Sequence, residues 1–114
     1  MARRDLSGAI DFTVLERMTG GEDGISEEVL GLFVQQAALW SPMLDVREDG
    51  WRDAVHTLRG AAAGIGAETL AQVCQAAEKP EAPPLLDRVR DALEAALADV
   101  AAYRHELMLR GLRG

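Results

Sequence analysis

The most informative residue for chemistry in this 114-residue sequence is a histidine, His56. It lies in a stretch from Trp51 to Ile65 in which apolar residues recur at helical spacing. On a helical wheel at about 100° per residue, one narrow arc holds the apolar residues Trp51, Val55, Leu58, Ala62 and Ile65. His56 points roughly 140° away from that arc. We therefore expect its imidazole at the surface or at the edge of a groove.

The neighbours of His56 distinguish it from an ordinary surface histidine. Positions three and four residues away lie beside a helical side chain, which places Arg59 and Gly60 on one side and Arg52 on the other. A glycine inside an exposed helix face costs about 0.8–1 kcal/mol relative to alanine. One explanation is that Gly60 or Gly64 ends the helix or lets two helices pack closely. The explanation we favour is that something large must approach His56 along this face.

This arrangement suits phosphoryl chemistry. A solvent-exposed imidazole has a pKa near 6.5 and is often neutral at physiological pH, so a ring nitrogen can attack a phosphoryl group and hold it as a phosphoramidate. Arg59 can offset charge on the phosphoryl oxygens, because a guanidinium suits phosphate geometry. Gly60 leaves space for that group and for the protein that brings it. Phosphoryl transfer depends mostly on positioning and electrostatics, which a partner and its metal can supply.

No second catalytic arrangement is evident in the sequence. It has neither a GxxxxGK[ST] run nor a kinase-type glycine-rich loop, and His56 has no partners at metal-ligand spacing. We therefore expect no nucleotide, metal or cofactor site in this chain. The single cysteine, Cys74, is expected to be buried and inert. His105 lies more than a quarter turn off the apolar stripe of its helix and is expected to be a solvated surface residue.

The elements that must position His56 are helical, because β-branched residues are sparse and apolar residues recur at helical spacing. Asp11 is the expected N-cap of a short first helix, and Ser26 begins the second. Pro42 should kink or break that helix. The predicted helices cover about 11–18, 26–44, 51–65, 68–78 and 85–109, with a proline-rich connection over 79–84. The expected fold is all-α: an antiparallel four-helix bundle with an additional short N-terminal helix, forming a single domain over 1–114 after a flexible tail over 1–10.

Composition narrows the class of protein. Nineteen acidic against twelve basic residues give a net charge of −7, which disfavours nucleic acids and anionic membranes as partners. The sequence has no signal peptide and no apolar run of the roughly 18–20 residues that span a bilayer. One cysteine permits no intramolecular disulfide, which fits a reducing compartment. We expect a soluble, cytoplasmic monomer. The acidic residues expected on ordinary solvated helix faces are Glu27, Glu28, Asp87, Asp91, Glu94 and Asp99.

The run HTLRGAAAGIGAETL from His56 to Leu70 resembles the signature of histidine-containing phosphotransfer (HPt) domains. That signature reads roughly H-x-L-[KR]-G-[SA]-[SA]-x-x-[LI]-G-[AL]-x-x-L. The resemblance is dense over residues 51–78. The second helix, with Phe33, and the long last helix fit the family's layout, whereas the first 25 residues fit loosely.

The resemblance implies a four-helix bundle and a role for each matching residue. His56 falls on the phosphorylated histidine, and Arg59 falls on the basic position beside the phosphoryl group, where lysine is commoner. Gly60 falls on the glycine that clears the docking face. Glu78 falls where members often carry Gln or Glu close to the imidazole, although it could equally be a solvated charge at a helix end.

The resemblance also implies the partners, which are the receiver domains of hybrid kinases and of response regulators. Their acidic, magnesium-binding pocket would suit Arg52 and Arg59. On this interpretation the chain accepts a phosphoryl group on His56 from a receiver aspartate and passes it to a response regulator in a multistep phosphorelay. It is then a carrier rather than an enzyme, and Mg²⁺ is expected on the partner.

Three other interpretations stay open. The chain could be the phosphoacceptor domain of a larger chemotaxis-type kinase; because it ends at Gly114, we expect a stand-alone protein or an excised domain instead. It could be the dimerising hairpin of a sensor kinase, but there an acidic residue follows the histidine, whereas Thr57 follows it here. It could also be a helical adaptor without phosphorylation, on which His56 is merely a surface residue.

Overall fold

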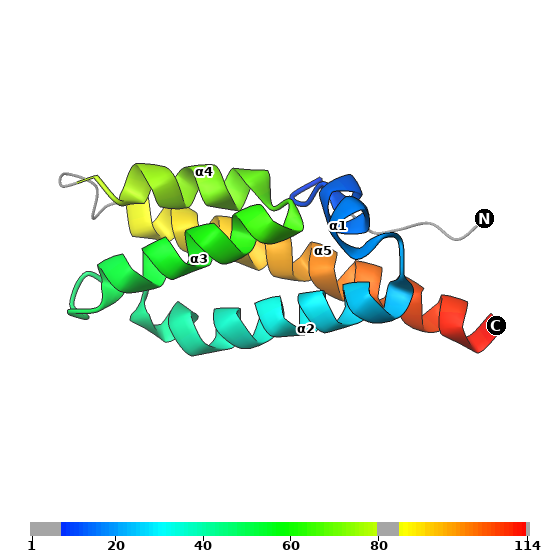
Figure 1. Ribbon diagram of the computed structural model, residues 1–114. Helices are drawn as coiled ribbons and strands as arrows, with labels where there is room; N and C mark the ends of the chain where they lie inside the picture. Colours follow the sequence, from blue (N-terminus) through cyan, green and yellow to red (C-terminus); the bar gives the residue numbers. More distant parts are fainter. Residues whose placement is uncertain (1–7, 80–84, 114) are drawn as a thin grey trace.

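The computed structural model describes residues 8–79 and 85–113, and these parts of the chain are built from helices (Figure 1). The elements are α1 (Phe12–Thr19), α2 (Asp23–Trp40), the 3₁₀ turn η1 (Ser41–Met43), α3 (Trp51–Ile65), α4 (Glu68–Ala77) and α5 (Leu86–Arg113). Helices α2 to α5 run alongside one another in alternating directions, and α1 packs on α2 and α3 near one end. The predicted all-α bundle is confirmed.

The long axis of the molecule follows α5. The 28 residues of this helix span about 42 Å at 1.5 Å per residue, and the whole molecule measures 50 × 22 × 21 Å. Helix α5 extends four residues beyond its predicted end at Leu109. Its last turns project past the bundle, beyond the start of α2 (Figure 1). No helix in the described ranges is long and apolar enough to cross a membrane.

Helix α2 corrects two details of the sequence-based prediction. It begins at Asp23, three residues before Ser26, and Glu22 occupies the N-cap position. Ser26 is buried inside the helix, where its hydroxyl lies 3.0 Å from the hydroxyl of Thr19 and joins α2 to α1. The helix ends at Trp40, just before Pro42, because proline removes a backbone donor and clashes with the preceding turn. Pro42 therefore breaks the helix and lies within η1.

The packed part of the domain begins earlier in the sequence than expected. Asp11 is the N-cap of α1, as predicted, and accepts a hydrogen bond of 3.0 Å from the backbone N–H of Thr13. Ile10, assigned to the flexible tail, is buried in the core at 5% exposure. The backbone N–H of Ala9 donates to the carboxylate of Asp99 at 3.0 Å. The packed domain therefore reaches upstream of residue 10, and residues 1–7 of the predicted tail lie outside the described part of the chain.

Asp99 was expected on a solvated face of α5 and is instead fully buried. A buried carboxylate is costly unless it has hydrogen-bond donors, and the N–H of Ala9 supplies one of them. The wheel could not find this partner, because the two residues are ninety positions apart in the sequence. Glu27 also has a specific role, since it forms an ion pair with Arg104 that joins α2 to α5.

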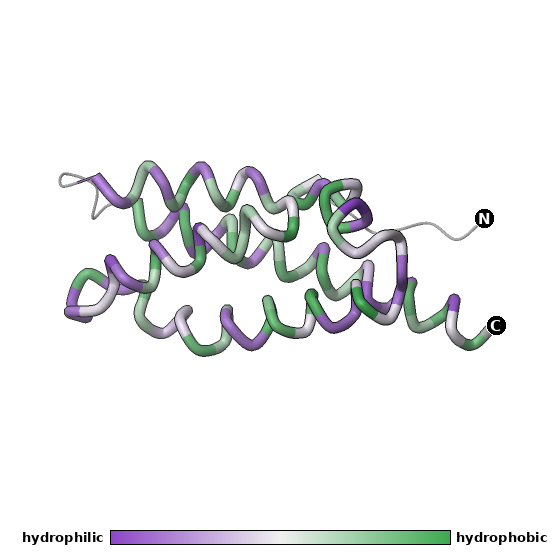
Figure 2. Tube along the Cα trace, viewed as in Figure 1, coloured by the Kyte–Doolittle hydropathy of each residue, from purple (hydrophilic) through white to green (hydrophobic). Residues whose placement is uncertain are grey.

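The core lies where the apolar faces of the helices meet along the bundle axis (Figure 2). Trp51, Val55, Leu58, Ala62 and Ile65 of α3 are all buried, as the wheel predicted. Phe12 of α1 stacks on Tyr103 of α5 with ring centroids 4.0 Å apart, which ties the short helix to the bundle. Cys74 is buried as expected, and burial raises the pKa of its thiol to about 12, with the charge of Glu78 adding to the effect.

The connection between α3 and α4 depends on Gly66. This residue has φ +82° and ends α3 in the left-handed conformation that glycine adopts without strain. A Cβ built at this position would lie 2.3 Å from the backbone oxygen of Asp11. The N–H of Asp11 in turn donates to the Gly66 oxygen at 2.8 Å. The left-handed turn at Gly66 lets α4 run back antiparallel to α3, so that the end of α4 returns to the first half of α3.

Candidate functional site

His56 lies in the first half of α3 and faces solvent, with 76% of its side chain exposed. The preceding residue, Val55, is fully buried, so the buried and exposed faces of α3 meet between these two positions. The wheel therefore placed this imidazole correctly. Since α3 has the predicted bounds of Trp51–Ile65, His56 and Gly60 both lie well inside the helix.

The carboxylate of Glu78 connects two of the predicted site residues. Glu78 is the C-cap residue of α4, and the ends of α4 and η1 and the start of α3 lie at the same end of the bundle (Figure 1). Oε1 of Glu78 lies 2.8 Å from Nδ1 of His56. Oε2 accepts a hydrogen bond of 2.7 Å from the guanidinium of Arg59. The structure thus brings His56, Arg59 and Glu78 together, and the alternative that Glu78 is merely a solvated helix-end charge does not hold.

The charge of Glu78 is set by these two contacts. Burial raises the pKa of this carboxyl, but hydrogen bonds from His56 and Arg59, together with their charges, outweigh burial and leave the pKa below its ordinary value. An ionised carboxylate can only accept hydrogen bonds, so its contact with Nδ1 assigns the ring proton to Nδ1. In the neutral ring, Nε2 then carries the free lone pair. The ring nitrogen that does not contact Glu78 can therefore act as a nucleophile.

Gly60 lies in the middle of α3, one turn after His56. A Cβ at this position would meet nothing within 4 Å. The helix continues to Ile65, and no neighbouring helix approaches the bare backbone. Both structural explanations for Gly60, a helix end and close helix packing, therefore fail. The same open space surrounds Gly64 one turn later, so the surface beside His56 is unobstructed along this part of the helix.

An apolar groove continues this open surface towards α2. It has a volume of about 200 Å³ and is lined by Met18, Val29, Leu32, Phe33, Gln36, Ala61, Gly64 and Ile65. Leu32 and Leu39 stand on the outer side of α2 with 60% and 64% exposure. Sequence reasoning did not single out this outer stripe of α2. Its signal was present in the sequence, because Ile25, Leu32 and Leu39 recur at intervals of seven.

Arg52 was named as a neighbour of His56 without a defined contact. Its guanidinium lies over the ring of Trp51, with Cζ 4.3 Å from the ring centroid. One of its terminal nitrogens lies 3.5 Å from the backbone oxygen of Glu78. Three side chains of α3, those of Arg52, His56 and Arg59, therefore contact the same residue of α4.

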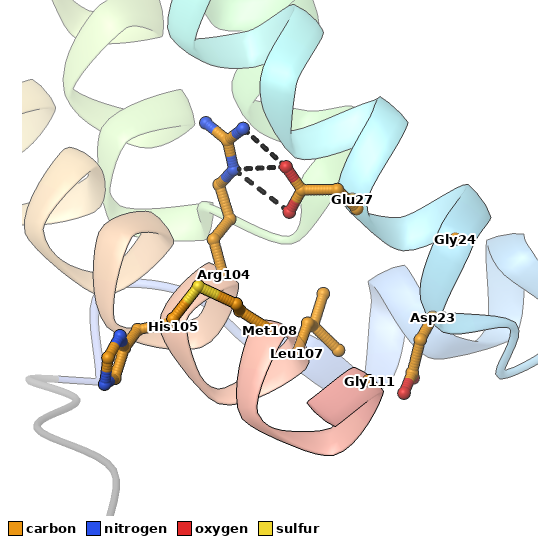
Figure 3. A pocket seen from close by; sticks show the side chains of 8 residues that line it. All are labelled: Asp23, Gly24, Glu27, Arg104, His105, Leu107, Met108 and Gly111. Carbon is orange, nitrogen blue, oxygen red and sulfur yellow. Dashed lines mark hydrogen bonds and ion pairs between the residues drawn. The ribbon is translucent and has the colours of Figure 1, made fainter. Parts of the chain in front are cut away.

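The second histidine lies far from this site. His105 is exposed on α5, as predicted, and lines a pocket of about 580 Å³ between the start of α2 and the end of α5 (Figure 3). Figure 3 shows the Arg104–Glu27 pair on one side of that pocket, whereas the His105 ring takes part in none of the contacts drawn. Within the described residues, no group of three or more His, Cys, Asp or Glu side chains is arranged to hold a metal ion.

Comparisons with known proteins agree with this architecture. The model of the Hpt domain family matches residues 28–102. The chain therefore belongs to the Hpt domain family, as the His56–Leu70 motif indicated.

Among solved structures, it resembles the crystal structure of the histidine phosphotransferase ShpA from Caulobacter crescentus. The two are 51% identical with a TM-score of 0.82, over 92% of this chain and 99% of that one. A search of the curated proteins finds no match. Family and structure together support a phosphocarrier role in a phosphorelay.

Proposed function

We propose that this protein carries a phosphoryl group on Nε2 of His56, receives it from the phosphorylated aspartate of one receiver domain and passes it to another. The observation that supports this most directly is the contact between Nδ1 of His56 and the carboxylate of Glu78, 2.8 Å long. It leaves Nε2, the ring nitrogen that does not contact Glu78, as the nucleophile. The exposed position of the ring then allows a partner to reach it.

The bonds formed and broken in this transfer balance without a cofactor in this chain. Nε2 attacks the phosphorus of the aspartyl phosphate, an N–P bond forms, and the P–O bond to the aspartate breaks, so that the aspartate leaves as a carboxylate. The proton on Nδ1 stays hydrogen-bonded to Glu78, which offsets the positive charge of the phosphorylated ring. Arg59 is close enough to stabilise the phosphoryl oxygens, because its guanidinium already lies beside this ring through Glu78. The reverse sequence delivers the group to the next aspartate.

The partner supplies what this chain does not bring. A receiver domain holds its own aspartate and Mg²⁺, and metal and pocket then provide most of the electrostatic catalysis. This chain provides an accessible ring, a bare helix face at Gly60 and Gly64, and the α2–α3 groove. A specific protein interface covers about 800 Å² on each partner. A receiver centred on His56 would therefore also cover Leu39 and the groove at Leu32.

A transfer assay tests the proposal. Purified protein is incubated with an active hybrid kinase, its receiver domain and labelled ATP, and the acid lability of the label is measured. We expect acid-labile label on the wild-type chain, none on His56→Gln and wild-type labelling of His105→Gln. The second variant controls for loss of a surface histidine.

Two results would overturn the proposal. One is equal labelling of His56→Gln and the wild-type chain. The other is a wild-type chain that takes no label from any phosphorylated receiver of its source organism. Transfer onward is tested by adding each unphosphorylated receiver to the labelled chain, which also identifies the downstream partner.

A further inference from the structure

Arg52 makes two contacts that together fix its guanidinium. Trp51, the first residue of α3, is 7% exposed, so its indole is a rigid surface. The Arg52 guanidinium lies over that indole at 4.3 Å, a distance at which a cation is attracted to the ring face. From there it reaches to 3.5 Å from the backbone oxygen of Glu78.

The backbone oxygen of Glu78 is a site that favours a cation. Glu78 is the C-cap of α4, and the last carbonyls of a helix lack intrahelical partners and carry the negative end of the helix dipole. Arg52, His56 and Arg59 are separated by four and three positions, so all three project from the same side of α3. Arg52 contacts the main chain of Glu78, and the other two contact its two carboxylate oxygens.

We infer that Arg52 is a positioning residue, which holds the C-terminal end of α4 against α3 so that the Glu78 carboxylate meets Nδ1 of His56. Helix α4 has only ten residues, and Glu78 lies just beyond its last turn. A terminal residue of this kind frays unless something restrains its main chain. The Glu78 side chain can select one ring tautomer only while its backbone stays in place. The consequence for phosphoryl transfer rests on the proposed function, whereas the effect on the imidazole does not.

The test measures the ring of His56 in the unphosphorylated protein. Nitrogen-15 chemical shifts of the imidazole distinguish the tautomer with the proton on Nδ1 from the tautomer with the proton on Nε2. Wild-type protein should show the Nδ1–H form. Arg52→Ala should show a mixture of tautomers, as should Glu78→Ala, in which the carboxylate is gone. Arg52→Lys should recover much of the wild-type signal, because an ammonium can also donate to a carbonyl.

Two controls separate this effect from others. Arg88→Ala removes the same charge from an exposed position on α5 and should keep the wild-type tautomer. Arg52→Met keeps much of the side chain over Trp51 and removes both the charge and the N–H donors, so it should behave like Arg52→Ala. Dispersed amide spectra establish that each variant is folded, and Arg52 is an exposed residue.

The inference predicts that Arg52→Ala lowers the rate of phosphorylation at saturating receiver by about the fraction of Nδ1–H tautomer lost. A wild-type tautomer in Arg52→Ala would overturn it. In that case a rise in KM alone would show that Arg52 acts by contacting the receiver. Because the tautomer is read without a phosphodonor, a chain that fails to become phosphorylated would overturn the proposed function and leave the positioning role to be decided by the spectrum.

Discussion

At the scale of single residues, the site depends on one carboxylate that contacts both an imidazole and a guanidinium. Glu78 holds the imidazole proton with one oxygen and the Arg59 guanidinium with the other. Arg59 offsets the negative charge that a carboxylate would otherwise place beside the phosphoryl group. When a phosphoryl group is on Nε2, Arg59 can turn to it while Glu78 keeps Nδ1–H. The same three side chains thus suit both the unphosphorylated and the phosphorylated imidazole.

The lowered pKa of Glu78 predicts a pH-dependent contribution to stability. A carboxyl whose pKa is lower in the folded than in the unfolded state stabilises the fold above its unfolded pKa, ordinarily 4.5, and loses that contribution as the pH falls through the lowered value. We expect Glu78→Gln to unfold at lower urea than wild type at pH 7. The gap between the two should shrink steadily below about pH 4.5.

The difference between the two proteins isolates Glu78, because the other acidic groups titrate in both. Glu94→Gln, at an exposed position of α5, should leave little gap at either pH. A gap between wild type and Glu78→Gln that stays constant from pH 7 to pH 3 would contradict the ion-pair assignment.

Most of these residues could be identified from the sequence, but the contacts that join them through Glu78 could not. His56, Arg59 and Gly60 follow from helical spacing, because they belong to one helix. Glu78 came only from the family resemblance, since its distance to His56 depends on how α4 returns along α3. The contacts of Arg52 and Asp99 could not be predicted for the same reason. Each has a partner at least 26 positions away in the sequence, and a helical wheel shows only neighbours within one helix.

At the scale of elements, Gly60 makes α3 less stable than alanine would, and it leaves the surface beside His56 open. Because a Cβ there would meet nothing, Gly60→Ala should raise the free energy of unfolding by about 0.8–1 kcal/mol, the helix-propensity difference. Gly60→Leu should also fold, but its side chain would occupy the space beside His56. We expect it to reduce transfer from a phosphorylated receiver at least tenfold, mainly through KM.

Urea unfolding and the transfer assay check the two halves of this prediction. Gly111→Leu places the same side chain on another open helical glycine, near the end of α5, and should leave transfer unchanged. The account would be contradicted by wild-type transfer in Gly60→Leu. It would equally be contradicted by a loss of stability in Gly60→Ala, which would reveal a packing role.

Helix boundaries were predictable where a local signal sets them. Asp11 and Pro42 mark a start and an end through their own backbone chemistry, and α3 matched its predicted bounds. The start of α2 was wrong because Ser26, a good N-cap residue, instead serves the contact between α1 and α2. Gly66 appeared in the motif, but its close approach to Asp11 is a tertiary contact that only the fold reveals.

At the scale of the whole molecule, an acidic protein presents an unobstructed, partly apolar face beside its site. The net charge is −7, yet every residue that lines the α2–α3 groove is uncharged. Such a surface suits transient docking, which the proposed function requires, because a carrier between two receivers must release one before it binds the other. On the proposed function, we expect the exposed leucines of α2 to contribute to binding a receiver rather than to folding.

Leu32→Ser tests this separation. With 60% of its surface already exposed, Leu32 should contribute little to the core, and the free energy of unfolding should change by no more than about 0.5 kcal/mol. Binding of a receiver, measured by calorimetry, should weaken at least tenfold. Met108→Ser, 53% exposed on α5 and outside the α2–α3 groove, is the matched control and should bind normally. Equal binding by wild type and Leu32→Ser would show that the groove is not part of the docking surface.

The most direct test of the central claim is the identity of the phosphorylated atom. The chain is phosphorylated by a receiver, and phosphorus–proton and nitrogen-15 correlation spectra locate the N–P bond. We predict a single phosphohistidine at His56, with the phosphoryl group on Nε2 and the proton on Nδ1. A phosphoryl group on Nδ1 of His56, on His105 or on any hydroxyl or carboxylate would contradict the account.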